Sequence, residues 1–388
     1  MTMVIAALAC VSWLYLLLMR GGFWRVPKRL DDVSSVPDAR RAWPRVVAIV
    51  PARNEAELIA ESVASLLRQD YRGAFHVVVV DDHSTDSTAA VAQRAAAACG
   101  ASERMTVLAA PPLEDRWTGK LWAMNCGVVH AEAMPEPADY LLFSDADIGY
   151  APDTLTKLVM RAEADSLALT SLMARLHCES LAERALIPAF VFFFRMLYPF
   201  AWVNEPQRRT AAAAGGCMLV QRSALRDAGG LDAIRHELID DCALGRLLKR
   251  RGRIWLGLTQ RARSLRACCS IGDVRRMVGR SAYAQLRYSP WLLIGTLAAM
   301  SVTYLAPPLL ALSAVDAVRW LAVATWLLMA ALLQPILRFY RVSPCWGLAL
   351  PAIAATYLVF TVDSAYRHWR GQGGEWKGRV HIPAPDGQ

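Results

Sequence analysis

Four long runs without charged residues are the feature that most constrains this chain. One lies at the N-terminus, residues 3–19, and three lie near the C-terminus, at 290–315, 320–337 and 345–362. Each run is long enough for a helix to cross a hydrocarbon core of about 30 Å. Hydrophobic residues make up 55% of the chain, more than an ordinary soluble enzyme contains. The runs therefore predict a membrane protein whose globular part lies between them.

The N-terminal run predicts an uncleaved anchor over residues 1–20. Basic residues follow this run, beginning with Arg20, whereas a signal peptide carries them before its apolar core. The positive-inside rule then predicts an external N-terminus, with the chain from residue 20 onward in the cytoplasm.

The C-terminal region, residues 290–365, is expected to contain two or three crossings. Three crossings from the cytoplasm would leave the polar tail, residues 366–388, outside. The tail nevertheless carries basic residues, which favour the inside: Arg367, Arg370, Lys377 and Arg379. Pro307 with Pro308, or Pro351, marks the alternative of a re-entrant or interfacial segment.

Residues 40–288 are predicted to form one α/β domain. Apolar runs at 46–50, 76–80 and 140–143 have the length and composition of buried strands, and a polar loop follows each. Residues 55–68 have the pattern of an amphipathic helix. Alternation of strand, loop and helix indicates parallel βαβ units, in which ligands bind beyond the carboxyl ends of the strands.

Acidic residues stand at two of these strand ends. Asp145 and Asp147 are two positions apart after the third strand, so both carboxylates face the same side of an extended segment. Such a pair suits Mg²⁺ or Mn²⁺ shared with a diphosphate. Asp81 and Asp82 follow the second strand, where they are able to accept hydrogen bonds from a nucleobase or a ribose, and Ser84 and Asp86 after them are expected to cap the next helix.

Positive charge is concentrated in the second half of the domain. Residues 204–287 hold 17 Lys and Arg against seven Asp and Glu. Anionic headgroups or a diphosphate substrate fit this excess, and a solvated face that enforces orientation is the alternative. No aromatic interleaving or known binding module accompanies the charge, so no nucleic-acid partner is expected.

Several motifs occur in order along the domain. They are VAIVPARNE (47–55), VVVVDDHSTDST (77–88), WTGKLWAMNCG (117–127), SDAD (144–147), AAGGCMLVQRSALRDAGGLD (213–232) and IDDCALGRLLKRRG (239–252). In this order they resemble the family 2 nucleotide-sugar glycosyltransferases. The resemblance covers about residues 46–289 and implies a GT-A fold, an α/β fold with a mixed, mostly parallel sheet flanked by helices.

The family resemblance also implies roles for individual residues. Asp241 matches the catalytic base, Asp147 the metal ligand, and Asp145 the neighbouring metal or ribose ligand. Lys120 is similar to a lysine near the donor phosphates, with a surface lysine as the alternative. The remaining residues implied in donor binding are Pro51, Arg53, Glu55, Asp81 and Asp82. Mg²⁺ or Mn²⁺ is the implied cofactor.

Two departures from the family pattern bear on mechanism. The acid before the base is Asp240 instead of the usual Glu, which leaves both Asp240 and Asp241 as candidate bases. Processive synthases carry QxxRW after this point, and only Arg280 of it is retained here, in residues 277–281. This loss favours transfer of a single sugar. Arg280 is a candidate diphosphate ligand, with a structural ion pair as the alternative.

The hopanoid-biosynthesis-associated glycosyltransferases, bacterial membrane proteins within family 2, give the nearest overall likeness. The likeness rests on the PARNE opening, WTGKLWA, GGCMLV, RSAYAQLRYSPW and the GEWKGRV tail. The same layout occurs in ceramide glucosyltransferase-like and carotenoid glycosyltransferases. All three resemblances imply a membrane lipid as acceptor, hopanoid-related for the first, at the cytoplasmic face of the bacterial inner membrane. The aromatic run 186–203, between Pro188 and Pro199, is read either as a core segment or as a short interfacial helix that admits a lipid.

Three other functions compete with this expectation. A polymer synthase and an inactive membrane scaffold share the fold, and the full set of acidic positions argues against the scaffold. A nucleotide-dependent dehydrogenase would need GxGxxG after the first strand, and PARNEAE does not match it.

Overall fold

The computed structural model describes residues 1–26, 30, 42–373, 375–377 and 379–380, and these divide into two units. The helical unit comprises Met1–Val26, Cys178–Ala201 and Cys268–Glu375; the sheet unit comprises Pro27–His177, Trp202–Ala267 and Trp376–Gln388. The sequence predicted one domain over 40–288, whereas two of its segments belong here to the helical unit. Positions 40 and 41, and much of the predicted tail, lie outside the described residues.

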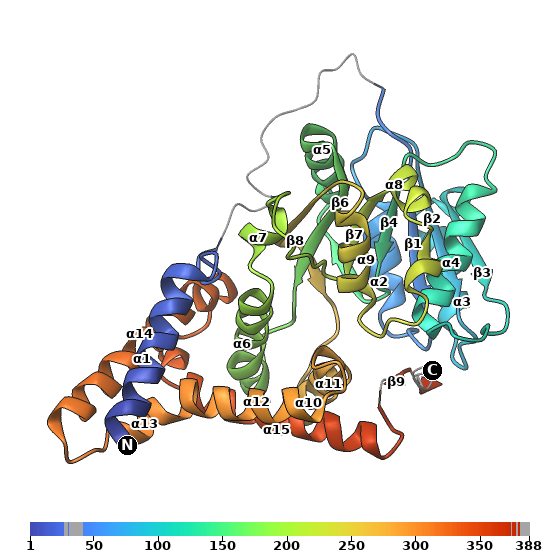
Figure 1. Cartoon of the computed structure of the whole chain (residues 1–388). Coiled ribbons are helices and arrows are strands. Elements are labelled where there is room, and N and C mark those ends of the chain that lie inside the picture. The colour runs from blue at the N-terminus through green and yellow to red at the C-terminus, as the bar shows by residue number, and fades with distance from the viewer. Residues whose placement is uncertain (27–29, 31–41, 374, 378, 381–388) are drawn as a thin grey trace. The chain divides into compact units, whose positions relative to one another are not determined.

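An eight-stranded sheet forms the core of the sheet unit, in the order β3-β2-β1-β4-β7-β6-β8-β5 (Figure 1). Its strands are β1 (Val46–Ala52), β2 (Phe75–Asp81), β3 (Met105–Ala109), β4 (Tyr140–Ser144), β5 (Ile148–Tyr150), β6 (Leu167–Arg175), β7 (Cys217–Gln221) and β8 (Arg253–Ser264). β1 pairs in parallel with β2 and β4, β2 with β3, and β6 with β8, while β7 is antiparallel to β4 and β6, and β5 to β8. The predicted mixed, mostly parallel GT-A-like sheet is confirmed.

Strands β1, β2 and β4 have the uninterrupted apolar composition of central parallel strands. All seven residues of β1 are buried, because helices cover the sheet and leave no face of this strand in water. The flanking helices are α2 (Ile59–Leu67), α3 (Thr88–Ala98), α4 (Gly119–Glu132), α5 (Thr154–Asp165), α7 (Phe200–Asn204), α8 (Arg222–Asp227) and α9 (Asp240–Lys249). The three predicted strands are confirmed, and the helix predicted from residue 55 begins at Ile59.

The register of the sheet brings the polar loops together. Ala52 is opposite Asp81, and Ile49 is opposite Phe143. The carboxyl ends of β1, β2 and β4 therefore meet at one edge, and the loops that follow them converge there.

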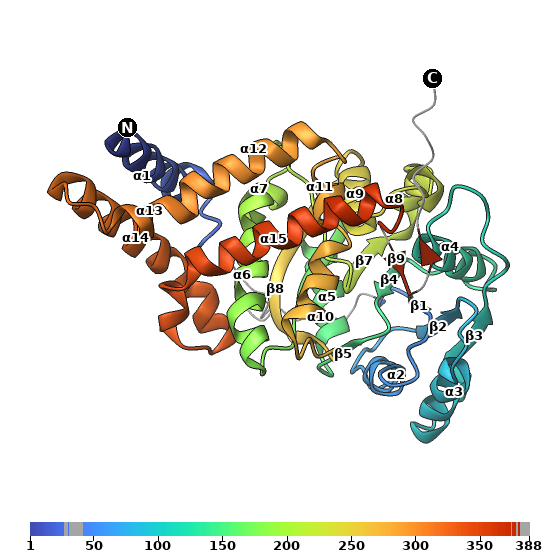
Figure 2. The same cartoon turned by 90° about the horizontal axis from the view of Figure 1, so that it is seen from below.

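Apolar helices make up the helical unit. They are α1 (Thr2–Met19), α6 (Leu181–Leu197), α10 (Ile271–Gly279), α11 (Ala282–Gln285), α12 (Pro290–Met300), a π-helical stretch Ser301–Leu305, α13 (Ala306–Leu310), α14 (Asp316–Tyr340) and α15 (Leu350–Trp369). Figure 2 shows α12 and α15 side by side, and the two helices are in contact. The fully buried Trp13 of α1 donates from Nε1 to the carbonyl of Thr303 at 2.8 Å and meets the Tyr304 ring edge-on.

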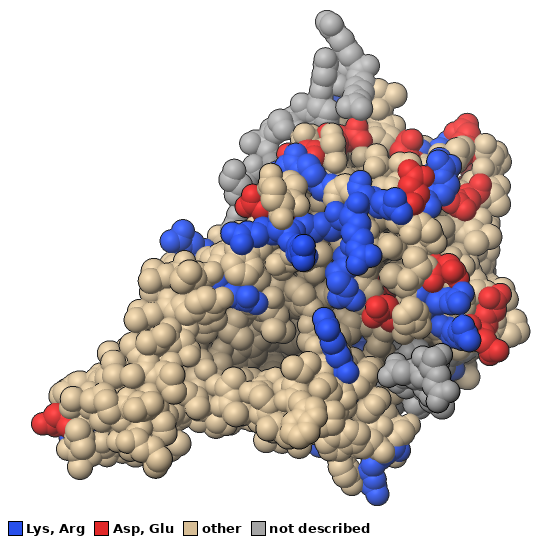
Figure 3. Space-filling view, in the orientation of Figure 1, with Lys and Arg blue, Asp and Glu red and all other residues tan. Residues whose placement is uncertain are grey.

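Three helices in the described part of the chain are long and apolar enough to cross a membrane. They are Thr2–Met19, Pro290–Leu310 and Asp316–Tyr340, and α15 is not one of them. In the space-filling view the surface of these C-terminal helices is almost free of charged side chains, while Lys and Arg gather over the sheet unit (Figure 3). The predicted apolar helices at both ends are confirmed, and they indicate association with a membrane.

The aromatic run 186–203 forms part of a longer helix. Ser180 and Glu183 form a capping box that starts α6 at Leu181, so Pro188 lies inside the helix. The prediction that Pro188 bounds a short helix is therefore wrong, because the cap lies two turns earlier. Phe192 is buried against Phe23, so this part of the run packs within the helical unit.

Candidate active site

The loops after β1 and β2 hold several predicted donor-binding residues in a strained arrangement. Asn54 and His83 both adopt the left-handed backbone region, with φ of 51° and 53°. Asn54 accepts a 2.8 Å hydrogen bond from the backbone N–H of Thr85, which ties the two loops together. Non-glycine residues in this region cost free energy and cluster at functional sites.

The two acids after β2 have different surroundings. Oδ1 of Asp81 accepts hydrogen bonds from the backbone and hydroxyl of Ser84, which form a local turn. Asp82 is fully buried, and Arg53 Nη1 lies 3.6 Å from its Oδ2 and also donates to its carbonyl. Arg53 and Asp82, predicted separately as donor ligands, thus form one ion pair.

The side chains of Asp86 and Ser84 form hydrogen bonds within the loops, and of the two only Asp86 also binds the first residue of the helix that follows. Asp86 accepts a 2.9 Å hydrogen bond from the backbone N–H of Thr88 at the start of α3 and a 3.1 Å bond from Ala56. Ser87 is the N-cap residue of α3 and makes no side-chain cap bond, so neither Asp86 nor Ser84 occupies the capping position; Ser84 binds Asp81 and accepts from the N–H of Asn54.

Lys120 lies at the N-terminal end of α4, among acidic side chains. Its Nζ is 2.8 Å from Oδ1 of Asp145 and 3.1 Å from Oδ2 of Asp240. Burial alone would lower the pKa of Lys120, but Asp145, Asp240 and Asp241 outweigh burial and raise it. A lysine that is charged and held between two carboxylates is no ordinary surface lysine, so the alternative considered for Lys120 does not hold.

Asp241, in the first turn of α9, is held by backbone N–H groups. Its Oδ2 accepts from Gly215 at 3.0 Å and its Oδ1 from Cys242 at 2.6 Å. Burial, followed by the charge of Asp240, raises the pKa of Asp241 to about 6. A carboxylate with a pKa near neutrality is suited to accept a proton under physiological conditions.

Asp145 and Asp147 present hard oxygen donors at the end of β4. Burial raises the pKa of Asp145. Asp147 pairs through Oδ2 with Nε of Arg266 at 2.9 Å. Among the described residues, no three His, Cys, Asp or Glu side chains form a metal-binding group. Two carboxylates at a strand end have the donor chemistry of Mg²⁺ and Mn²⁺, ions that take few protein ligands and complete their shell with phosphate and water.

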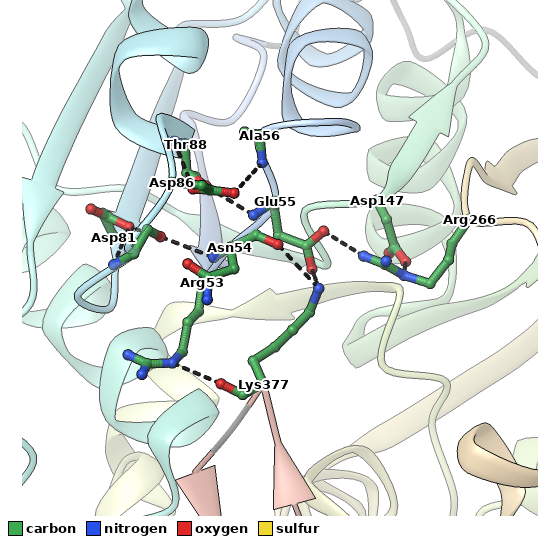
Figure 4. Close-up of polar contacts among 11 residues, drawn as sticks. Arg53, Asn54, Glu55, Ala56, Asp81, Asp86, Thr88, Asp147, Arg266 and Lys377 are labelled. Carbon is green, nitrogen blue, oxygen red and sulfur yellow. Dashed lines mark hydrogen bonds and ion pairs between the residues drawn. The ribbon is translucent and has the colours of Figure 1, made fainter. Parts of the chain in front are cut away.

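Glu55 joins the β1 loop to two cations that sequence analysis did not identify. Lys377 Nζ lies 2.8 Å from its Oε1, and Arg266 pairs with its Oε2 (Figure 4). Arg266 follows β8 in the basic half of the domain, and Lys377 belongs to the tail motif GEWKGRV. Neither has a spacing relation to Glu55 in the sequence.

The structure brings together most of the predicted site residues at the edge formed by β1, β2 and β4. Pro51 is buried within β1, directly before the loop that carries Arg53 and Glu55. Arg280 is exposed at the C-terminal end of α10, in the helical unit, and its proposed part in donor binding stays a prediction.

Comparison with known proteins gives the same family for the sheet unit. Residues 47–229 match the family described as Glycosyl transferase family 2. An N-acetylglucosaminyltransferase of Mesorhizobium japonicum is 27% identical over 214 residues, which cover 52% of this chain and 45% of that protein. Another, of Rhizobium leguminosarum bv. viciae, is 30% identical over 193 residues, covering 47% and 40%. The chain thus spans less than half the length of these relatives.

Similarity to a solved structure extends over nearly the whole chain. The mannosyltransferase of Pyrobaculum calidifontis, solved in complex with GDP-Man and Mn²⁺, has a TM-score of 0.56 and 21% identity, covering 94% of this chain and 99% of that one. At this identity the likeness concerns the fold. Residues 47–229 therefore match glycosyltransferase family 2, and the sheet has a GT-A-like fold.

Proposed function

We propose that this protein is an inverting glycosyltransferase that moves one sugar from a nucleotide-sugar donor to a membrane lipid. The observation that carries the proposal is the cluster in which Lys120 links Asp145 to Asp240 while Asp241 stands beside it with a pKa near 6. A cation next to a candidate metal ligand and a candidate base within the same cluster are the groups that glycosyl transfer requires.

In the proposed reaction the acceptor hydroxyl attacks the anomeric carbon and loses its proton to Asp241. The new C–O bond forms as the bond to the nucleoside diphosphate breaks on the opposite face, and the diphosphate leaves with the electron pair. Lys120, next to Asp145, would place its positive charge near the leaving diphosphate. A divalent cation held by Asp145 and Asp147 would add charge neutralisation for the leaving diphosphate.

The donor is proposed to lie over the loops after β1 and β2. Arg53 would contact the nucleoside and is itself held by the buried Asp82, with Pro51, Glu55 and Asp81 around it, and Arg280 is a proposed diphosphate ligand. The curated relatives are N-acetylglucosaminyltransferases and the solved mannosyltransferase bound GDP-Man, so N-acetylglucosamine and mannose nucleotides are the first donors to test.

A lipid acceptor is supported by the apolar helices of the helical unit. The hopanoid-associated resemblance makes a hopanoid-related lipid the first acceptor to test, and the exposed apolar side chains of α12, such as Trp291, suit a hydrophobic environment. The catalytic domain would then work at the cytoplasmic face of the inner membrane.

The contacts of Lys377 favour two membrane crossings in the C-terminal region rather than three. Lys377 pairs with Glu55, so the tail and the sheet unit lie on the same side of the membrane. An even number of crossings must then separate Ala267 from Lys377, and Pro290–Leu310 and Asp316–Tyr340 supply two. In this topology α15 does not cross. Cysteines placed at Ser313 and at Gln372 test it: an external, impermeant thiol reagent should label intact cells at 313 and not at 372.

The test of function is an incubation of membranes containing the protein with labelled nucleotide sugars and Mg²⁺ or Mn²⁺, followed by analysis of the lipid fraction. A labelled lipid carrying one sugar supports the proposal. Extended chains of sugar would favour the polymer synthase. Failure of every donor to label lipid would favour the scaffold alternative. Full activity of both Asp147→Asn and Asp241→Asn would instead contradict the roles proposed for these two residues.

A further inference from the structure

Glu55 is bound on both carboxylate oxygens by cations from distant parts of the chain. Its side chain is only 10% exposed, with Lys377 Nζ 2.8 Å from Oε1 and Arg266 on Oε2. A nearly buried carboxylate needs such partners, because an uncompensated charge at this depth is costly.

Lys377 contacts the same loop in two further ways. Its Nζ donates to the carbonyl of Asn54 at 3.3 Å, and its own carbonyl accepts from Nε of Arg53 at 3.0 Å (Figure 4). One tail residue therefore contacts three consecutive residues, Arg53, Asn54 and Glu55. Two of these, Arg53 and Glu55, are proposed donor ligands.

Lys377 has a left-handed backbone conformation, which is unusual for a lysine. It follows the short strand β9 (Glu375–Trp376), precedes β10 (Arg379–Val380), and has a φ of 49°. This conformation disfavours a non-glycine residue, and Asn54, which it contacts, shares it with a φ of 51°. A turn selected only for its shape would favour glycine or asparagine, so a lysine here indicates a requirement for its side chain.

We propose that Lys377 is a positioning residue of the donor site: by binding Glu55 and Arg53 it holds the β1 loop in the conformation that receives the nucleoside diphosphate. The C-terminal tail thereby completes a site whose other residues lie about a hundred positions or more earlier in the chain. This inference rests on the proposed function, since it concerns the donor of that reaction.

Binding of GDP and UDP to the full-length protein in detergent, measured by calorimetry with Mg²⁺ and without acceptor, tests the inference. Lys377→Ala should weaken the affinity for the nucleotide that wild type binds by about tenfold, the scale of one charged hydrogen bond. Lys377→Arg, which keeps the charge, should recover most of it. In turnover the KM for donor should rise while the KM for the lipid is unchanged.

A double-mutant cycle separates positioning from general stability. If Lys377 acts through Glu55, Lys377→Ala should have little further effect on nucleotide affinity in a Glu55→Gln background. Arg370→Ala is the matched control, because Arg370 is an exposed tail cation that contacts the Tyr366 ring and none of the β1-loop residues named above.

The outcomes distinguish this inference from the proposed function. If wild type binds neither GDP nor UDP and transfers no sugar, the proposed function fails. If wild type binds nucleotide and Lys377→Ala binds it equally well, the positioning role alone is overturned. Additive effects in the double mutant, or equal loss from Arg370→Ala, would also overturn it.

Discussion

The ammonium of Lys120 lies 2.8 Å from Oδ1 of Asp145, the first carboxylate of the predicted metal pair. Asp145 directly follows β4, and Lys120 is the second residue of α4, so the contact joins a strand end to a helix N-terminus across the candidate site. Through its second contact, with Asp240, the same ammonium connects the metal pair to the candidate base. The charge of Lys120 thus acts on both the proposed metal ligand Asp145 and the candidate base Asp240.

Replacement of Lys120 by Met should reduce sugar transfer by roughly 100-fold or more, since it removes a preorganised charge next to the leaving group. The measurement is kcat/KM with a labelled donor. Lys157→Met on α5 is the matched control and should remain near wild type. Equal activity of the two variants would contradict the role of Lys120.

The pH profile of transfer should show an acid limb near pH 6, because Asp241 must be ionised to accept a proton and its pKa is raised to about 6. Below this value kcat/KM should fall about tenfold per pH unit. Asp240→Asn removes a charge that raises this pKa, so the limb should move to lower pH. If Asp240→Asn abolishes transfer and Asp241→Asn retains it, Asp240 is the base.

The same titration has a consequence for folding. Because the pKa of Asp241 is raised above its usual 3.8, ionisation disfavours the folded state. The stabilising contribution is present below pH 3.8 and is lost as pH rises through about 6. The midpoint of thermal unfolding of Asp241→Asn should therefore exceed that of wild type, and the difference should be larger at pH 8 than at pH 5.

Gly215→Ala should impair catalysis with little change in folding. An added Cβ would lie 3.2 Å from Lys120 Nζ, so this ammonium would have to shift by a few tenths of an ångström, while Asp241 Oδ2 at 3.5 Å would be in ordinary van der Waals contact. Displacements in a catalytic cluster lower rates by roughly 10- to 100-fold. Gly295→Ala, whose Cβ meets no atom within 4 Å, is the control, and wild-type kcat in Gly215→Ala would contradict the argument.

Asp147→Asn should lower transfer by roughly 100-fold and raise the concentration of Mg²⁺ or Mn²⁺ needed for half-maximal activity, because one of two protein ligands is weakened. Chelation of divalent ions should abolish wild-type transfer, and added Mn²⁺ should restore it. Asp165→Asn, which affects an ion pair with Arg161 on α5, is the control. Activity that survives chelation would rule out the proposed cofactor.

Lys249→Met should destabilise the sheet unit by about 2 kcal/mol, the cost of leaving acceptors without a charged donor. Lys249 Nζ donates to the carbonyls of Trp202, Val203 and Thr210, at 3.1, 2.7 and 2.7 Å. Thermal unfolding of the purified protein measures the effect. A midpoint equal to that of wild type would show that these bonds contribute nothing to stability.

The strands and most of the acidic site were predictable because their signals are local. β1, β2 and β4 are short apolar runs ended by polar residues, and parallel strands place such ends at one edge of a sheet. Asp145 and Asp147 were recognisable as acids at a strand end, but residues 146–147 form a turn instead of the expected extended segment, and the two carboxylates bind different cations, Lys120 and Arg266.

Segments whose partners are remote were not predictable in this way. The start of α6 depends on the capping box at Ser180, which outweighs the expectation drawn from Pro188. The division into two units assigns 178–201 to the apolar helices, because its aromatic side chains find their partners there.

By itself, the sequence determined the class of fold, the apolar helices at both ends and the acidic residues at the strand ends, since each follows from periodicity or composition over a few residues. Only the tertiary structure decided that Lys120 bridges Asp145 and Asp240, and that Arg266 and Lys377 share Glu55. The physical reason is that an ion pair depends on distance in space. No local sequence pattern shows that Lys377 lies next to Glu55 in the folded protein.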